Sequence, residues 1–209
     1  MASMEPGISS SRVGDHLRSE LLRLSHDIHQ LIQTLETSEC SVLHELEHIH
    51  QSFHDIQTAT ASYYLRSYLA AFTNHFEVLS VAIQHLSERN HGALIAIQRE
   101  DKLEEHLHAG IPLHAELSHP LLESIFYTGN PLHDGGVLIH QDTIVSAANV
   151  LPLSENMTIR GKVGTRHRAA LGLSEQTDAL VLTVSEETGR ATFAFGGNLY
   201  PIRTSSGLV

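Results

Sequence analysis

Three side chains that suit anion binding follow one another in the stretch GTRHRAALG, which begins at residue 164. We predict a short helix over 165–175, so that Arg166, His167 and Arg168 occupy its first turn. The first amide N–H groups of a helix have no internal partner, and the helix dipole is positive there. Two guanidinium groups and an imidazole at such an end predict a polyphosphate site. The alternative is a surface turn whose basic side chains bind nothing. This alternative is less favourable, because positive side chains are repelled by the positive end of the helix dipole.

A carboxylate stands directly before two glycines in PLHDGGVLIH, residues 131–140. The start of a strand needs neither the charge of Asp134 nor two residues without side chains. Gly135 and Gly136 would let a ligand approach the backbone closely. The carboxylate would then hold a metal ion or activate a hydroxyl group.

A third polar stretch, TVSEETG at 183–189, ends a predicted strand and enters a hairpin turn. Ser185 offers a hydroxyl group, and Glu186 and Glu187 offer carboxylates for a metal ion. Such turns are often polar without having a function, so this stretch alone is weak evidence for a binding site. Beside the other two it completes a set: a carboxylate with backbone access, a phosphate cradle and metal ligands.

The stretch HELEH at 44–48 also matches a chemical pattern, the H-E-x-x-H motif of zinc peptidases. Histidine is abundant in this chain, with 17 residues, so accidental matches are common. The helix predicted there is short, and no catalytic domain surrounds it to form a cleft. We therefore interpret His44 and His48 as adventitious zinc ligands at most.

The composition suits a globular protein with a sizeable core, since 41% of the 209 residues are hydrophobic. A formal net charge of −11 argues against binding to a DNA backbone. Four of the 13 Lys and Arg nevertheless lie within 160–168 with no acidic residue among them, which still allows a small anionic ligand. No apolar run is long enough for a membrane span, and no secretory signal is visible. The single cysteine, Cys40, excludes a disulfide framework, so we expect a cytoplasmic protein.

Apolar residues at alternating steps of four and three predict two N-terminal helices, over 17–35 and 42–56. Their connection, TSECS at 37–41, is short, and short connections make antiparallel neighbours. We therefore expect a helical hairpin within residues 1–60. A third helix is predicted over about 61–89, at the start of a second domain that covers 61–209.

After this third helix the pattern changes to short apolar runs bounded by turn residues. The predicted strands cover 92–98, 135–140, 143–153, 179–185 and 190–196. Helices are predicted between them at 118–130 and 165–175. Strands that mix with helices and are partly joined by hairpins indicate an α/β domain with a mixed, twisted β-sheet flanked by helices.

These motifs together resemble the diadenylate cyclase domain. That family carries an Asp-Gly-Ala motif and an Arg-His-Arg motif, and both have counterparts here in the same order, at 134–136 and 166–168. Further similar segments are LPLSE (151–155), VSEETG (184–189), GALIAIQR (92–99) and GIPLHAELS (110–118), the last two resembling early strands. The resemblance covers roughly 75–200, more than half of the chain. It departs at Gly136, where the family usually has alanine, and we expect activity to survive because a smaller residue keeps the backbone accessible.

The resemblance implies condensation of two ATP molecules into cyclic di-AMP, with release of two pyrophosphates. Each protomer binds one ATP, and two protomers must face each other so that each ribose 3′-oxygen attacks the partner's α-phosphorus. Arg166, His167 and Arg168 would hold the phosphates and stabilise the leaving pyrophosphate. Asp134 would bind the metal, activate the 3′-hydroxyl, or do both.

The remaining site residues follow from the same resemblance. Leu151 and its neighbours resemble the adenine contact, with Thr165 and Ser185 close to the nucleotide and Gly135 and Gly136 beneath it. His133 is a candidate metal ligand beside Asp134, and Glu187 or Glu186 is a weaker one. An imidazole ligand would favour Mn²⁺ or Co²⁺ beside Mg²⁺.

Known relatives carry membrane helices or DNA-binding regions where this chain has the hairpin, which resembles that of the short soluble type associated with spore-forming bacteria. We expect the hairpin to assemble copies into a homo-oligomer, a hexamer being one geometry, and to inhibit activity if that geometry disfavours face-to-face pairing. The alternative function is a non-catalytic adenine-nucleotide sensor of the same fold, against which the intact Asp134 argues. A metal-binding histidine scaffold would leave the second half of the chain unexplained.

Overall fold

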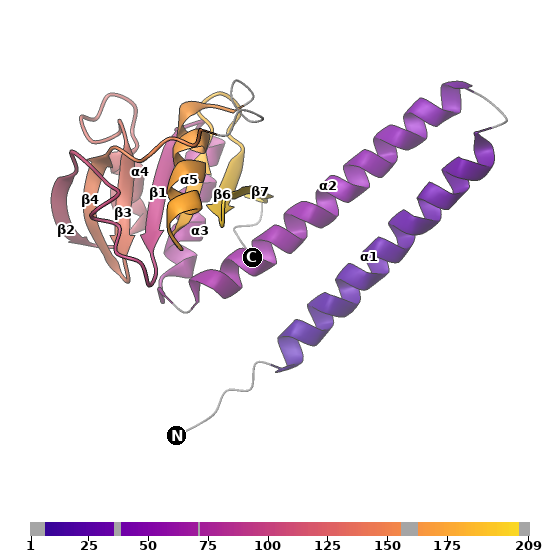
Figure 1. Ribbon diagram of the computed structural model, residues 1–209, viewed down its shortest axis with the longest axis horizontal. Coiled ribbons are helices and arrows are strands. Elements are labelled where there is room, and N and C mark those ends of the chain that lie inside the picture. Colours follow the sequence, from indigo (N-terminus) through magenta and orange to yellow (C-terminus); the bar gives the residue numbers. More distant parts are fainter. Residues whose placement is uncertain (1–6, 36–38, 71, 156–162, 205–209) are drawn as a thin grey trace. The chain divides into compact units, whose positions relative to one another are not determined.

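The computed structural model describes residues 7–35, 39–70, 72–155 and 163–204. The chain divides into two compact units, Met1–Thr60 and Ala61–Val209. The first contains α1 (Gly7–Thr34) and the beginning of α2 (Glu39–Leu69), and the second contains the other elements (Figure 1). Within the described ranges we find no helix that combines the length and apolar content needed to cross a membrane.

Seven strands form one sheet in the order β2-β4-β3-β1-β5-β6-β7. The strands are β1 (Ala93–Gln98), β2 (Ile111–Glu116), β3 (Gly136–His140), β4 (Thr143–Asn149), β5 (Leu180–Val184), β6 (Ala191–Phe195) and β7 (Asn198–Ile202). β1 and β3 pair in parallel, and the other neighbouring pairs are antiparallel. The predicted α/β fold with a mixed sheet is therefore confirmed.

The central strand β1 contributes to two cores, one on each face of the sheet. Ile95 and Ile97 belong to a core with the end of α2, with α3 (Phe76–Glu88) and with α4 (His119–Ile125). Leu94 and Ala96 belong to the other core, under α5 (Thr165–Gln176), which lies on the opposite face in Figure 1. Burial on both faces explains why this strand is a continuous apolar run rather than an alternating one.

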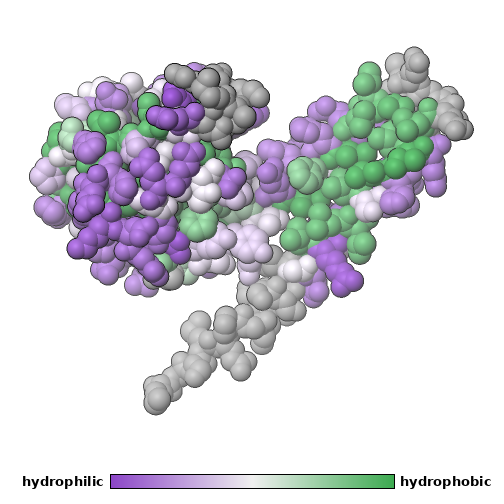
Figure 2. All heavy atoms as spheres, viewed as in Figure 1, coloured by the Kyte–Doolittle hydropathy of each residue, from purple (hydrophilic) through white to green (hydrophobic). Residues whose placement is uncertain are grey.

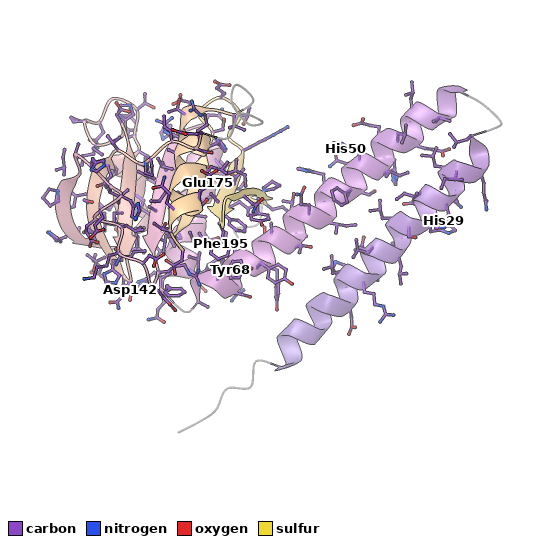
Figure 3. The ribbon with its side chains drawn as sticks, in the orientation of Figure 1. His29, His50, Tyr68, Asp142, Glu175 and Phe195 are labelled. Atoms are coloured by element: carbon purple, nitrogen blue, oxygen red, sulfur yellow. The ribbon has the colours of Figure 1, made fainter. Side chains whose placement is uncertain are left out.

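The prediction of one helix over 61–89 is wrong, because α2 runs on to Leu69 and α3 is a separate helix. No glycine or proline interrupts the chain at the predicted boundary, and the hydroxyl of Thr58 donates to the carbonyl of His54 at 2.8 Å. Farther along, Leu65 and Leu69 are fully buried in the core. Tyr68 also packs on Phe195 of β6, with ring centroids 4.9 Å apart (Figure 3).

The break between α2 and α3 depends on a contact with the turn between β3 and β4. The carboxylate of Asp142 in that turn accepts hydrogen bonds from the hydroxyl of Thr73, at 3.0 Å, and from the amide of Asn74, at 3.3 Å (Figure 3). The Thr73 hydroxyl in turn accepts from the amide of His75, directly before α3. The bond between Thr73 and His75 is local, but the contact with Asp142 joins residues far apart in the sequence and leaves no local signal.

Other elements also differ from the prediction, since α1 begins at Gly7 and not at 17, and β4 ends at Asn149 and not at 153. β7 was not predicted, and it contains Pro201, which disfavours a central strand but is tolerated at the edge of the sheet where β7 lies. α4 ends at Ile125 instead of 130, and Gly129 adopts a φ of +93° in the turn that follows. Ser118 occupies the predicted N-cap position, although its hydroxyl makes no capping hydrogen bond.

A tight backbone approach fixes the loop before β3 against the end of β4. Gly135 has a φ of +114°, and a Cβ placed on it would lie 2.7 Å from the carbonyl oxygen of Asn149 and 2.8 Å from the carbonyl carbon of Ala148. The buried Asn149 side chain donates to the carbonyl of Gly136 at 2.9 Å and accepts from the hydroxyl of Ser146 at 3.0 Å. Packing between two backbones therefore requires Gly135, whether or not a ligand is bound.

A partly buried carboxylate on α4 joins α4 to α3. Glu123 accepts hydrogen bonds from Nδ1 of His85 at 2.8 Å, Nδ1 of His119 at 2.9 Å and Nη1 of Arg89 at 2.6 Å. Burial by itself raises the pKa of Glu123, but the hydrogen bonds from His119, His85 and Arg89 outweigh this effect and lower the pKa to about 2. The ionised carboxylate therefore stabilises the packing of the two helices.

Gly135→Ala should lower the free energy of unfolding by about 2 kcal/mol or more, because the added methyl group meets backbone atoms and the left-handed φ is strained. Urea denaturation measures the difference. Gly164→Ala is the matched control, since a Cβ there meets no atom within 4 Å, and it should cost at most about 1 kcal/mol, the usual cost of alanine at an N-cap. Equal effects of the two substitutions would contradict the backbone contact.

Glu123→Gln should destabilise the chain by about 1–2 kcal/mol at pH 7. The carboxylate stabilises the fold above its unfolded pKa of about 4.3, and this contribution is lost as the pH falls through its folded pKa of about 2. The difference from the parent should therefore shrink between about pH 5 and about pH 2 in thermal melts. The exposed Glu104→Gln serves as control; a Glu123→Gln effect independent of pH would rule out the ionised cluster.

Candidate active site

The candidate active site lies at one end of the strands, where β1 and β3 begin and β4 and β5 end. The register pairs Gly136 with Asn149 and Ala93 with Val184, which brings these four strand ends together. A cavity of about 900 Å³ opens there. Its wall is formed by the Asp134 loop, the segment after β4, the start of α5 and the turn between β5 and β6. The three stretches singled out in the sequence thus meet at one cavity.

The N-terminus of α5 faces this cavity. Gly164 occupies the N-cap position with extended backbone, no side chain caps the helix, and its first turn contains no acidic residue. Thr165, Arg166 and His167 all line the cavity. Because the first amides of a helix lack internal partners, this end offers N–H donors and a positive dipole to an anion.

The two arginines of the motif have different surroundings. Arg166 lies on the cavity wall, where its Nη1 forms an ion pair with Oε2 of Glu186 at 2.7 Å, and its guanidinium fills the space that a side chain at Gly92 would need. Arg168 is not among the lining residues, and its Nη2 donates to the carbonyl of Ser154 at 3.4 Å. Arg166 is therefore placed to meet a ligand, whereas Arg168 supports the neighbouring loop.

The imidazole of His167 is half-buried, and this burial lowers its pKa below the ordinary histidine value. His167 is consequently neutral near pH 7 and offers a hydrogen bond to the cavity instead of a full charge. A bound anion would oppose this shift, since a nearby negative charge favours the imidazolium form.

Asp134 presents an exposed carboxylate to the cavity, and among the described residues no side chain forms a hydrogen bond or ion pair with it. Glu187 also lines the cavity. Carboxylate oxygens suit hard divalent ions such as Mg²⁺ and Mn²⁺, so this donor set fits the expected metal. His133 is not among the lining residues, and its Nδ1 donates to the carbonyl of Asn130 at 2.6 Å.

Another part of the wall is apolar. Leu151 is buried and lines the cavity together with Val150 and Leu153, which are partly exposed. A Cβ on Gly136 would lie 2.7 Å from Cδ1 of Leu151, so Gly136 sits behind this leucine and not on the wall. Leu94 of β1 completes the surface. Such a strip is suited to the face of a planar base.

Ser185 lines the cavity, and its hydroxyl accepts a hydrogen bond from the amide of Thr188 at 3.3 Å. This bond shapes the turn after β5 and leaves the hydroxyl proton free for another acceptor. Arg190 contributes a further cation to the wall, which the sequence analysis missed. Asn149 was also missed, because its role depends on contacts made only in the folded chain. Arg160 and Lys162, part of the predicted basic stretch, lie outside the described residues.

The HELEH stretch lies in the N-terminal unit and not at this cavity. His44, Glu45 and His48 line a groove together with Asp27 of α1. Among the described residues, the group of three metal-ligating side chains whose donor atoms lie within 4.8 Å of one another is a different one, on α3 and α4.

Two families match the chain. Residues 80–199 match the family described as DisA bacterial checkpoint controller nucleotide-binding, and residues 4–72 match the family described as Diadenylate cyclase CdaS, N-terminal. The chain is 53% identical over 164 residues to Diadenylate cyclase CdaS of Bacillus thuringiensis, covering 78% of this chain and 81% of that protein. It is 47% identical over 195 residues to Cyclic di-AMP synthase CdaS of Bacillus subtilis, covering 93% and 94%.

Solved structures agree with these matches. A crystal structure described as the hypothetical membrane spanning protein from Bacillus cereus has a TM-score of 0.77 and 44% identity, with 93% of this chain and 95% of that chain covered. DacA from Staphylococcus aureus has a TM-score of 0.58 and 41% identity, covering 60% and 84%. Together with the matched families, these relatives confirm the predicted resemblance: the chain belongs to the diadenylate cyclase family.

Proposed function

We propose that this chain condenses two ATP molecules into cyclic di-AMP and two pyrophosphates at the cavity described above. The observation that carries the proposal is that one cavity is lined both by Asp134 and by the basic N-terminus of α5. The first suits a hydroxyl nucleophile or a metal ion, and the second suits a triphosphate. Phosphoryl transfer depends mainly on such positioning and charge neutralisation.

The phosphates would bind at the start of α5. The free amides of the first turn, the imidazole of His167 and the guanidinium of Arg166 converge on the cavity there. The exposed Glu186 pairs with Arg166, and the triphosphate would replace this carboxylate as the partner of the guanidinium. Arg168 would act indirectly, by holding the carbonyl of Ser154 in the loop that follows Leu151.

Adenine would lie on the apolar strip of Val150, Leu151 and Leu153, with Thr165 and Ser185 near the sugar and phosphates. Asp134 would accept the proton of the ribose 3′-hydroxyl. The 3′-oxygen then forms a bond to the α-phosphorus of the ATP on the facing protomer. The bond from that phosphorus to the oxygen that bridges to the β-phosphate breaks, and pyrophosphate leaves. Gly135 would let the nucleotide lie close to the loop, in addition to meeting the packing requirement of β4.

The reaction is metal-dependent, and Asp134 with Glu187 as a weaker ligand would hold a divalent ion, for which we propose Mn²⁺, Mg²⁺ or Co²⁺. When bound, the ion would neutralise phosphate charge and make the 3′-hydroxyl more acidic. His133 is a poorer candidate than the sequence suggested because one of its ring nitrogens is engaged by Asn130.

Both 3′-oxygens must react, so two copies with one ATP each would face each other. The exposed position of Asp134 on an open cavity supports this arrangement, because a nucleotide there remains accessible to a second protomer.

The N-terminal unit carries an apolar surface that supports assembly of copies. Leu22, Ile32, Leu43 and Phe53 are each more than half exposed, whereas Leu24 and Leu31 are buried. Figure 2 shows hydrophobic residues gathered along α1 and α2. Exposed apolar side chains gathered in this way are typical of interaction sites. A second copy of the chain is the proposed occupant, in an assembly such as a hexamer that holds active sites apart and inhibits the enzyme.

Asp134→Asn should reduce cyclic di-AMP formation by at least about 100-fold, because the amide cannot accept the 3′-proton or hold the metal as a carboxylate does. ATP binding should change little, since the phosphate cradle is intact. Chromatography of product formed with Mn²⁺ or Mg²⁺ and calorimetry of ATP binding measure the two effects. Asp15→Asn, at an exposed position on α1, is the control. An active Asp134→Asn enzyme would remove Asp134 from the chemistry.

Deletion of residues 1–60 should raise the specific activity several-fold and reduce the size of the assembly, since it leaves the second compact unit intact. Light scattering and the rate of product formation test both. The full-length double variant Leu22→Asn/Ile32→Asn should have the same effects by weakening the exposed surface. Unchanged or lower activity would contradict inhibition. ATP binding without product in every form would favour the nucleotide sensor.

A further inference from the structure

A second group of metal-ligating side chains lies on the face of the sheet opposite α5. It consists of His85, His119 and Glu123, and one donor atom from each lies within 4.8 Å of the other two. Nδ1 of His85 is 2.8 Å and Nδ1 of His119 is 2.9 Å from the same oxygen, Oε1 of Glu123. None of the three lines the candidate active site.

The fold holds these donors in place. His119 and Glu123 are separated by one turn of α4, so both project from the same side of that helix. His85 lies in the last turn of α3, beside Leu86, and Leu122 lies beside Glu123; both leucines are fully buried in the core. The imidazole rings of His85 and His119 meet edge to face, with centroids 5.8 Å apart. The group is therefore built on two rigid helices.

We propose that His85, His119 and Glu123 bind a divalent transition-metal ion, and specifically Zn²⁺, at a site separate from the catalytic one. Two imidazoles and one carboxylate are a ligand set that zinc accepts with water in the remaining position. Two nitrogen ligands disfavour Mg²⁺, which suits carboxylate, carbonyl and water oxygens. The two sites of this chain would thus differ in the ions that they select.

Arg89, which is outside this group of three ligands, orients the carboxylate. Arg89 holds Oε2 of Glu123 at 2.6 Å, which orients the carboxylate and leaves Oε1 directed between the two imidazoles. Zinc would bind the lone pairs of the two Nδ1 atoms, so the Nδ1 protons that His85 and His119 share with Oε1 move to Nε2 of the same ring, or to solvent from a ring that is already doubly protonated. Ligand atoms about 2.0–2.2 Å from the ion lie about 3.3 Å apart in a tetrahedral site, so the imidazoles need to separate from Oε1 by only about half an ångström. Arg89 is half exposed and can turn its charge toward water.

A chain with the HELEH histidines removed gives the sharpest test. In His44→Gln/His48→Gln, the competing motif is absent, while the proposed site is complete. After equilibration with excess Zn²⁺ and removal of weakly bound ion, we expect one zinc per chain by atomic emission. Co²⁺ in place of Zn²⁺ should give the visible absorption of a tetrahedral complex.

Adding His85→Gln or His119→Gln to this background should abolish the tightly bound ion and the cobalt spectrum, and weaken zinc affinity by at least about 100-fold in a competition with a chromophoric chelator. Circular dichroism confirms that each variant is folded. Zinc should also raise the melting temperature of the background protein but not that of the variants. The proposal would be overturned if the His44→Gln/His48→Gln protein contained almost no zinc. It would also be overturned if His85→Gln and His119→Gln left the zinc content, the cobalt spectrum and the zinc affinity unchanged. If the His85 and His119 variants fail to fold, the cobalt complex of the His44→Gln/His48→Gln protein decides the question. A spectrum without the absorption of a tetrahedral complex would then contradict the proposed site.

Discussion

Burial of β1 on both faces is the constraint on which the rest of this structure depends. Because no face of this strand is free, helices must cover the sheet on both sides, and the chemistry is confined to the ends of the strands. β1 and β3 run in parallel beside the antiparallel β4 and β5, so the beginnings of two strands and the ends of two others meet. This arrangement brings the Asp134 loop and the turn after β5 to one cavity, and the packing of α5 on the sheet adds the third motif.

The same constraint explains why one face of the cavity is polar and the other is not. α5 packs its small and apolar side chains on the sheet, and this packing fixes where its uncapped N-terminus emerges. The segment after β4 returns over the sheet with Leu151 inward. The anion-binding end of α5 and the apolar surface at Leu151 thus lie on two neighbouring segments of the chain. Each segment is held in place by the core beneath it.

Much of this could be predicted from local sequence. The apolar run of β1, the helical start at Thr165 and the carboxylate before Gly135 all depend on neighbours within a few residues. The missing parts depend on partners that are distant in the sequence. The connection between α2 and α3 is held by Asp142, the Asp134 loop is held by Asn149, and Glu123 meets His85 only because α3 and α4 pack together. The reason for Gly135 also differed from the prediction, since backbone packing against β4 requires it without any ligand.

The contact between Gly136 and Leu151 means that a residue behind the cavity wall and a residue on that wall compete for the same volume. The space that a methyl group on residue 136 would occupy is filled here by Cδ1 of Leu151. A chain with alanine at that position, as the family usually has, must withdraw or rotate the leucine. Substitutions at the two positions are therefore energetically coupled and not additive. The position of the Leu151 side chain, and with it the space for a base in the cavity, depends on the residue at 136. A substitution at this buried position therefore alters the volume available to a ligand.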